Sequence, residues 1–308
     1  MFAETRRLQS PSGASLAYRH QPAVGPAGGI VLISHGLSEH AGRYQRFAEV
    51  MAAASYHVYG HDHRGHGQTT AADAPAGRFS LRNGVEAVIT DVIALREHAA
   101  LAHPGLSLIL FGHSMGGLIG LNVAVDHPQK FDGVAVWNSN FHTGASGRLA
   151  QLVLVLERMF KGSDVPSAIL PRATFEAWGK AIPGHRTLSD WLSRDADEID
   201  RFLADPLCGS EASVGMWLDV VSLPFRALKR LDNLPKTMPI HLVGGGQDPA
   251  TDNGRAVTWL SNRLKAAGFS HITTRLYPDS RHETLNDHDH AVATADFIAW
   301  CNSLSATA

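Results

Sequence analysis

The sequence contains few cysteines, no long apolar run and no cluster of basic residues, and each absence excludes a class of protein. Only Cys208 and Cys301 are present among 308 residues, far apart and outside any C-x-x-C pair. This usage argues against a disulfide framework and a cysteine-zinc site, and it is typical of a reducing compartment. The net charge is −2 without a block of lysine or arginine. Nucleic acid is therefore not an expected partner.

The chain also lacks the apolar segments that membrane and secreted proteins carry. No uncharged apolar run reaches the roughly 18 residues needed to cross a bilayer. The first residues show no apolar core typical of a secretory signal, so we expect a cytoplasmic protein, or one peripheral at a membrane surface. There is no internal repeat and no low-complexity linker. The hydrophobic fraction of 44% is enough for a large core, which excludes disorder.

Strand and helix patterns alternate over the first 140 residues. A hairpin is expected around Pro11–Gly13. Buried strands are expected near residues 30, 57, 108 and 134, and helices with one apolar face over 39–54, 82–103 and about 116–125. Such alternation is typical of an α/β protein with a parallel sheet covered by helices on both faces.

The alternation stops near residue 140 and resumes near residue 239. Residues 148–161 predict a helix that is apolar on nearly every side, and the next sixty residues contain no clear strand. The alternation then continues with a strand over 239–244, a helix over 254–267, a strand over 271–277 and a helix over 289–303. The simplest account is one α/β core domain, residues 1–139 and 226–308, interrupted by a helical cap over residues 140–225.

Residues 112–116, Gly-His-Ser-Met-Gly, fit the pattern Gly-x-Ser-x-Gly. An apolar strand pattern precedes them and a helix pattern follows them. In that context the pentapeptide predicts a nucleophile elbow, in which the serine takes strained dihedral angles and the glycines avoid collision. Ser114 would then expose its Oγ at the tip of the turn, beside the N–H groups of a helix N-terminus.

A serine hydroxyl is a weak nucleophile near neutral pH, so it needs a base and a carboxylate that orients the base. In an open parallel sheet such groups gather beyond the carboxyl ends of the strands. Asp248 follows the strand at 239–244, and His282 follows the strand at 271–277. The order Ser114, Asp248, His282 is the order expected for this architecture.

Other residues in these loops remain alternatives. Asp252 and Asp279 compete for the role of the acid, and His288 and His290 compete for the role of the base. Asp248 is favoured as the acid, because it lies in a tight loop between glycines and a proline. A place at the start of the last helix favours a solvated role for the two competing histidines.

The tetrahedral intermediate of such a reaction carries a negative oxygen, which needs two N–H donors. One is expected from the backbone of Met115, directly after the nucleophile. The other is expected from Leu37, in the loop after the strand that ends at Ser34, where Gly36 lets the backbone approach closely.

A loop rich in histidine, residues 61–66, follows the second predicted strand. His61, His63 and His66 could ligate a metal, but glycine occupies the place where metallohydrolases carry a further carboxylate. The plainer interpretation is that Asp62 and Arg64 satisfy the backbone and each other beneath the site. We therefore expect neither a metal nor an organic cofactor.

Six stretches resemble the α/β-hydrolase superfamily and, within it, the monoacylglycerol lipase and lysophospholipase-like group. They run over nearly the whole chain and comprise residues 35–44 (HGLSEHAGRY), 62–67 (DHRGHG), 111–117 (FGHSMGG), 205–208 (DPLC), 246–249 (GQDP) and 281–283 (RHE). The sequence departs from the group at Gln68, where the family usually has serine. The cap matches weakly apart from residues 205–208.

The resemblance implies an α/β-hydrolase fold and a serine carboxylester hydrolase with Ser114, Asp248 and His282 as the triad. It also implies Leu37 and Met115 as oxyanion donors, and a cap that admits an acyl chain. The expected substrate is a single-acyl-chain ester such as a monoacylglycerol. A lysophospholipase, a short-chain carboxylesterase, a lactonase, an amidase, a peptidase, a metallohydrolase and a non-enzymatic member of the fold are the alternatives.

Two features of the cap remain open. Cys208 resembles a cap cysteine that thiol reagents reach in some relatives, whereas a plain buried thiol is the default. The apolar helix over 148–161 must bury its surface somewhere, with basic residues at its ends. It could pack against the core domain, lie transiently on an anionic membrane surface, or form a dimer contact. The sequence does not decide the oligomeric state.

Overall fold

A computed structural model describes residues 1–305 as an eight-stranded sheet with helices on both faces. The strands lie in the order β1-β2-β4-β3-β5-β6-β7-β8. They are β1 (Arg6–Gln9), β2 (Ser15–Gln21), β3 (Gly29–Ser34), β4 (Tyr56–His61), β5 (Leu108–His113), β6 (Gly133–Trp137), β7 (Ile240–Gly245) and β8 (Ile272–Tyr277). The β1–β2 and β2–β4 pairs are antiparallel and the other pairs are parallel. The predicted hairpin and mostly parallel sheet are confirmed.

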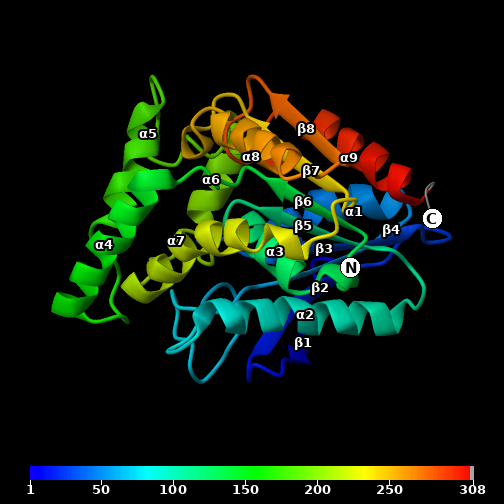
Figure 1. The fold of residues 1–308 in the computed structure, drawn as a ribbon, viewed down its shortest axis with the longest axis horizontal. Helices are drawn as coiled ribbons and strands as arrows, with labels where there is room; N and C mark the ends of the chain where they lie inside the picture. The colour runs from blue at the N-terminus through cyan, green and yellow to red at the C-terminus, as the bar shows by residue number, and fades with distance from the viewer. Residues whose placement is uncertain (306–308) are drawn as a thin grey trace.

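The helices cover the sheet in two layers (Figure 1). Helices α1 and α9 pack on one face, and α2, α3 and α8 pack on the other. Their bounds are α1 (Gln45–Ala53), α2 (Gly84–Ala102), α3 (Met115–Asp126), α8 (Arg255–Ala266) and α9 (His290–Ser305). The first part of the helix predicted over 39–54 is instead a 3-10 turn, Ala41–Tyr44. The other predicted helices agree with these bounds to within two residues.

The central strand β5 shows why the sheet is covered on both sides. Leu108 and Leu110 lie in the core beneath α2 and α3, whereas Ile109 and Phe111 lie in the core beneath α1 and α9. Successive side chains of a strand point to opposite faces, so a run of apolar residues is stable only with a helix layer on each face. The strand is buried along its whole length.

Between β6 and β7 the chain leaves the sheet and forms a helical segment, residues 138–239, which we call the β6–β7 insertion. It contains α4 (Gly144–Lys161), a π-helical turn (Arg172–Glu176), α5 (Ala177–Ala181), α6 (Ala196–Ala204) and α7 (Val214–Lys229). Helix α4 packs against α7, and α7 packs against α3. Figure 1 shows α4 and α5 projecting beyond one end of the sheet. The predicted boundary between residues 225 and 226 falls inside α7.

Helix α4 begins four residues before the predicted helix over 148–161, and most of its apolar residues are not buried. Its exposed apolar side chains are Leu149, Leu152, Leu156, Met159 and Phe160. Packing of this face against the core domain, one of the three interpretations above, is therefore wrong. Within residues 1–305, no helix is both long enough and apolar enough to cross a bilayer.

Candidate functional site

Ser114 is the single residue between β5 and α3, and its backbone is strained. Its φ of 54° and ψ of −120° lie in a region that residues with a side chain rarely adopt. The Ser114 N–H donates to the carbonyl of Trp137 at 2.8 Å, which ties the turn to the end of β6. The side chain consequently projects from the carboxyl edge of the sheet, at the start of a helix.

The glycines around Ser114 are required by close backbone packing. A Cβ at Gly116 would collide with the carbonyl oxygen of Ser34, and a Cβ at Gly112 would collide with the backbone of Gly116. Helix α3 therefore begins in direct backbone contact with the ends of β3 and β5. Only glycine permits this approach, which is what the sequence pattern predicts.

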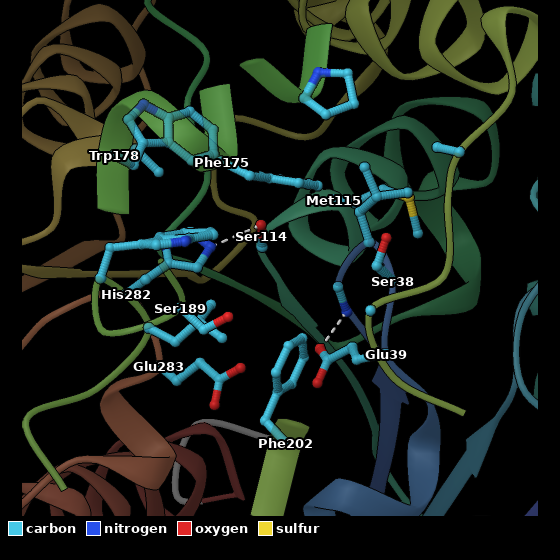
Figure 2. Close-up of a pocket in the computed structure, with 18 of the residues that line it drawn as sticks. Ser38, Glu39, Ser114, Met115, Phe175, Trp178, Ser189, Phe202, His282 and Glu283 are labelled. Atoms are coloured by element: carbon cyan, nitrogen blue, oxygen red, sulfur yellow. Dashed lines mark hydrogen bonds between the residues drawn. The ribbon is translucent and has the colours of Figure 1, made fainter. Parts of the chain in front are cut away.

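The structure brings Ser114, His282 and Asp248 into one hydrogen-bonded chain. The Ser114 Oγ lies 2.9 Å from His282 Nε2 (Figure 2). His282 Nδ1 lies 2.9 Å from Asp248 Oδ2. Asp248 is completely buried, and it also accepts hydrogen bonds from Thr251 Oγ1 and the Ala250 N–H. These partners fix the carboxylate, so the imidazole that binds it has one orientation and one tautomer.

The alternatives to these residues lie elsewhere. Asp252 forms an exposed ion pair with Arg255 at 2.6 Å, and Asp279 is exposed. His290 begins α9, and the His288 N–H is bonded to Asp287. None of the four takes part in the hydrogen-bonded chain of Ser114.

The electrostatics of the chain favour an imidazole that can accept a proton. Burial lowers the pKa of His282, but the Asp248 carboxylate outweighs burial and leaves the pKa above its ordinary value. The neighbouring His113 behaves differently, because burial lowers its pKa to about 4. Its ring meets the His282 ring edge-on, with centroids 4.9 Å apart. The neutral ring of His113 therefore packs beside the ring of His282, which becomes positively charged when it accepts a proton.

Two backbone N–H groups lie beside Ser114 without an acceptor in the part of the chain that the structure describes. They belong to Leu37 and Met115, and both residues line the same cavity as Ser114. Met115 is the first residue of α3, so its N–H has no partner within the helix. These are the two donors that the sequence predicts for an oxyanion, and unpaired N–H groups at this place could bind one.

The loop that carries Leu37 is held by a buried ionic network that sequence reasoning missed. The Glu39 carboxylate accepts hydrogen bonds from the Gly36 N–H at 2.6 Å and from the Tyr44 hydroxyl at 2.7 Å. Arg43 donates to Glu39 at 2.9 Å and to both oxygens of Glu283 at 2.5 and 2.7 Å. The i,i+4 spacing of Glu39 and Arg43 was a usable signal, but Glu283 is 240 residues away from Arg43.

A cavity of about 450 Å³ opens above Ser114, and its two ends differ in chemistry. Figure 2 shows Phe175 and Trp178 on one side of Ser114, and Glu39, Glu283 and Ser189 on the other. The apolar end is built by the β6–β7 insertion, with its aromatic side chains in mutual contact. They are Phe175, Trp178, Trp191 and Trp217. This volume is in the range of small-molecule binding sites.

The insertion is also bonded directly to the loop of His282. The His282 N–H donates to the carbonyl of Trp191 at 3.3 Å, and the Glu283 N–H donates to the carbonyl of Leu192 at 2.7 Å. Arg281 donates to the carbonyls of Asp190 and Ser193 at 2.6 and 2.9 Å. The wall of the cavity and the imidazole therefore hold each other in place.

The ring nitrogens of His61, His63 and His66 do not all come within 4.8 Å of one another. Burial lowers the pKa of His61 to about 4 and that of His63 well below its ordinary value. The His63 Nε2 bonds to the Ser34 Oγ at 2.9 Å instead. Within residues 1–305, the two groups whose ligand atoms all lie within 4.8 Å of one another include none of these three residues. The loop serves to pack beneath β3.

Those two groups are hydrogen-bonded clusters. In the first group, His20 Nε2 bonds to His57 Nδ1 at 3.3 Å, and His103 Nε2 bonds to the Tyr59 hydroxyl at 2.8 Å. In the second group, His40, Asp205 and Cys208, the His40 Nδ1 accepts from Gly42 N–H and the Nε2 bonds to Asp205. Neither arrangement offers a set of free lone pairs to a cation.

The structure also tests the predictions made for Asp62 and Cys208. Asp62 satisfies the backbone, because its carboxylate accepts from the N–H groups of Ala41 and Gln68 at 3.0 and 2.8 Å. The expected pair of Asp62 with Arg64 is wrong, since Arg64 forms a buried ion pair with Asp91 at 2.9 Å. Cys208 is partly buried, and burial raises the pKa of its thiol, which lowers its reactivity.

Comparison with known proteins identifies relatives over most of the chain. Residues 25–289 match the family model described as serine aminopeptidase, S33. The monoacylglycerol lipase of Mycolicibacterium smegmatis is 28% identical over 277 residues, which cover 88% of this chain and 87% of that protein. The human monoglyceride lipase is 27% identical over 256 residues, which cover 82% and 76% of the two chains.

Solved structures show the same fold. A thermostable carboxyl esterase from Bacillus coagulans, in complex with glycerol, has a TM-score of 0.88 at 24% identity and covers 98% of both chains. The monoacylglycerol lipase of Paleococcus ferrophilus has a TM-score of 0.70 at 24% identity and covers 94% of this chain and 99% of its own. At this identity the likeness establishes the fold.

Two alanine substitutions within α3 test the close packing at the elbow. Gly116→Ala forces the helix away from Ser34, and we expect it to lower the free energy of unfolding by about 3 kcal/mol. Gly120→Ala is the matched control, because its Cβ would lie 3.7 Å from Leu110 in ordinary contact. It should raise the free energy of unfolding by about 0.5 to 1 kcal/mol. Urea unfolding followed by fluorescence measures both, and equal effects would contradict the packing argument.

Proposed function

The chain belongs to the serine aminopeptidase S33 family of hydrolases, and on this basis we propose that it is a serine carboxylester hydrolase. The proposed substrate is an ester with a single acyl chain, such as a monoacylglycerol. The observation that carries the proposal is the chain of hydrogen bonds from Ser114 through His282 to the buried Asp248. The relatives named monoacylglycerol lipase and monoglyceride lipase support the choice of an ester.

In the proposed reaction the Ser114 Oγ attacks the ester carbonyl carbon while its proton passes to His282 Nε2. The carbonyl oxygen becomes an oxyanion, which the N–H groups of Leu37 and Met115 bind. The bond to the alcohol oxygen then breaks, and His282 returns the proton to that oxygen. Asp248 stabilises the imidazolium in between without taking the proton.

The acyl-enzyme is then hydrolysed by the same residues in reverse roles. Water attacks the acyl carbon, and His282 accepts a proton from it. The bond to Ser114 breaks, the serine oxygen regains that proton, and the carboxylic acid leaves. No metal or organic cofactor is needed at any step. The aromatic end of the cavity would hold the acyl chain, which supports a role of residues 140–225 as a cap over the substrate.

The family description names an aminopeptidase, but the cavity favours an ester with an apolar acyl group. An aminopeptidase must hold the free ammonium group of its substrate in a direct ion pair near the nucleophile, and the field of carboxylates that are already paired does not replace that contact. The buried carboxylates at this place, Glu39 and Glu283, already accept hydrogen bonds from Arg43. The opposite end offers the aromatic wall of Phe175 and Trp178, which suits an alkyl chain.

Replacement of Ser114 by alanine tests the reaction. We expect kcat/KM for p-nitrophenyl decanoate to fall by at least about ten-thousandfold, because the nucleophile is removed. A fluorophosphonate should label the natural protein and fail to label Ser114→Ala. Ser303→Ala, in α9, is the control and should match the natural protein.

The same assay separates the alternatives. Unchanged turnover in Ser114→Ala would overturn the proposal. Inactivation by a chelator without labelling by the fluorophosphonate would favour a metallohydrolase. Rates that fall for acyl chains longer than butanoyl would favour a short-chain esterase over an enzyme with an acyl-chain tunnel.

The pKa of His282 predicts the pH dependence. The proposed base must be neutral, so activity is present above its pKa and is lost as the pH falls through it. Because Asp248 raises that pKa, the acid limb of kcat/KM should lie above the ordinary value of 6.5. In Asp248→Asn the residual activity should be lower, and its acid limb should move to lower pH, since the strongest opponent of burial is then removed and only the weaker fields of Glu283 and Glu39 remain. Asp252→Asn, in the same loop, should leave the limb in place; an unmoved limb in Asp248→Asn would contradict the assignment.

We also propose that the exposed face of α4 contacts a lipid surface transiently while the substrate enters. Met159 and Phe160 are 73% and 86% exposed, and Arg158 and Lys161 lie beside them in the last turn. An apolar face flanked by cations is the arrangement that binds at an anionic membrane surface.

Vesicles test this contact. The double variant Met159→Ser and Phe160→Ser should bind anionic vesicles at least about tenfold more weakly, because each apolar side chain contributes about 1.5 to 3 kcal/mol when buried. Leu101→Ser, which removes an equally exposed leucine from α2, should bind as the natural protein does. Cosedimentation measures the binding. Equal binding of both variants would contradict the contact, and a change from dimer to monomer in the double variant would assign the face to a dimer.

A further inference from the structure

The charged residues that line the cavity are all of one sign. Among the lining residues within 1–305, four are glutamates and none is lysine or arginine. They are Glu39, Glu176, Glu211 and Glu283. Glu176 forms an exposed ion pair with Lys180, so solvent screens it. The other three define the charge that a bound molecule meets.

Two of these carboxylates are buried close to the proposed site of bond cleavage. Glu39 and Glu283 share the single guanidinium of Arg43, and all three side chains are less than a tenth exposed. Burial raises the pKa of Glu39, but Arg43 and its hydrogen bonds outweigh burial, and the pKa lies below its ordinary value. The carboxylate is therefore ionised at neutral pH, and two negative charges face one positive charge.

Among the cavity-lining residues of the described chain, no lysine or arginine balances this charge. Arg281 directly precedes the lining residues His282 and Glu283, but its guanidinium donates to the carbonyls of Asp190 and Ser193. Asp248 adds a further buried negative charge while His282 is neutral. Glu211 is exposed at the rim. A low-dielectric cavity with charges of one sign concentrates the field on whatever enters it.

The position of the carboxylates identifies the part of the substrate that meets them. Glu39 and Glu283 lie on the side of Ser114 opposite to Phe175 and Trp178 (Figure 2). If the acyl chain occupies the aromatic end, the alcohol portion of the ester lies beside the carboxylates. Their oxygens are already bonded to Arg43, so they act on the alcohol through their field rather than by a new ion pair.

We propose that this alcohol subsite selects the leaving group by charge: esters of cationic alcohols react best, esters of neutral alcohols next, and esters of anionic alcohols least. The inference rests on the proposed ester hydrolysis and names the substrate class within it. A lysophospholipid with an anionic phosphate beside the ester is thereby disfavoured. An alcohol that carries a quaternary ammonium group is favoured.

Two matched pairs of decanoyl esters separate charge from shape. The choline ester and the 3,3-dimethylbutyl ester have the same shape and differ only in the cationic nitrogen. The monodecanoyl glycerol and its 3-phosphate differ by an anionic group. We expect kcat/KM to be about tenfold higher for the choline ester than for its neutral isostere, and at least about tenfold lower for the phosphate than for the glycerol ester.

Salt and two variants identify the source of the preference. Both ratios should approach one at about 1 M ionic strength, where the Debye length is about 3 Å. Glu283→Gln should lower the choline preference by at least about threefold, and Glu211→Gln, which is exposed and does not endanger folding, should lower it by a smaller amount. Glu97→Gln, an exposed carboxylate of α2 outside the cavity, should leave both ratios unchanged.

The outcomes distinguish this inference from the proposed function. If Ser114-dependent hydrolysis occurs but the choline ester and its isostere react equally at low salt, the charge selection is overturned and the ester hydrolysis stands. A preference that survives in both Glu283→Gln and Glu211→Gln would likewise overturn it. If no ester is cleaved in a Ser114-dependent manner, the proposed function fails first.

Discussion

The geometry of the whole site depends on the contact between the start of α3 and the end of β3. Because Gly116 has no side chain, the helix begins against the carbonyl of Ser34, and the turn between β5 and α3 is reduced to Ser114 alone. The strain of that residue, with φ at 54°, persists only because the surrounding strands are buried on both faces. The hydroxyl, the Met115 N–H and the loop of Leu37 are placed together by this one contact.

Much of this arrangement is readable in the sequence, because each part follows from a strand end. Buried parallel strands give continuous apolar runs, and their loops meet at one edge of the sheet. The position of Asp248 after β7 and of His282 after β8 could therefore be expected before any coordinates. The structure places both within hydrogen-bond distance of their expected neighbours.

The parts that could not be predicted depend on contacts without a local pattern. Glu283 pairs with Arg43 across 240 residues of sequence, and no pattern in either segment predicts the pair. The bonds from the loop of His282 to the insertion use the carbonyls of Trp191 and Leu192, which every residue possesses. Likewise, an apolar helix pattern cannot say whether a face is covered, and α4 exposes its apolar face where packing against the core was one expectation.

The insertion consequently combines two physical roles. Its segment over residues 190–194 is bonded to the loop that carries His282, so it cannot move without disturbing the imidazole. Helix α4, by contrast, contacts α7 and presents an apolar face outward. A motion that admits a lipid would therefore be confined to the α4 side, while the aromatic wall near His282 stays in place.

The charge of the cavity affects the release of the acid product as well as the selection of the substrate. Ester hydrolysis converts a neutral acyl group into a carboxylate, which appears beside Ser114, next to the buried charges of Glu39, Glu283 and Asp248. Like charges in a low-dielectric site repel strongly. The same carboxylates that favour a cationic leaving group therefore disfavour the acid product, and they promote its departure. Substrate selection and product release then have one electrostatic cause.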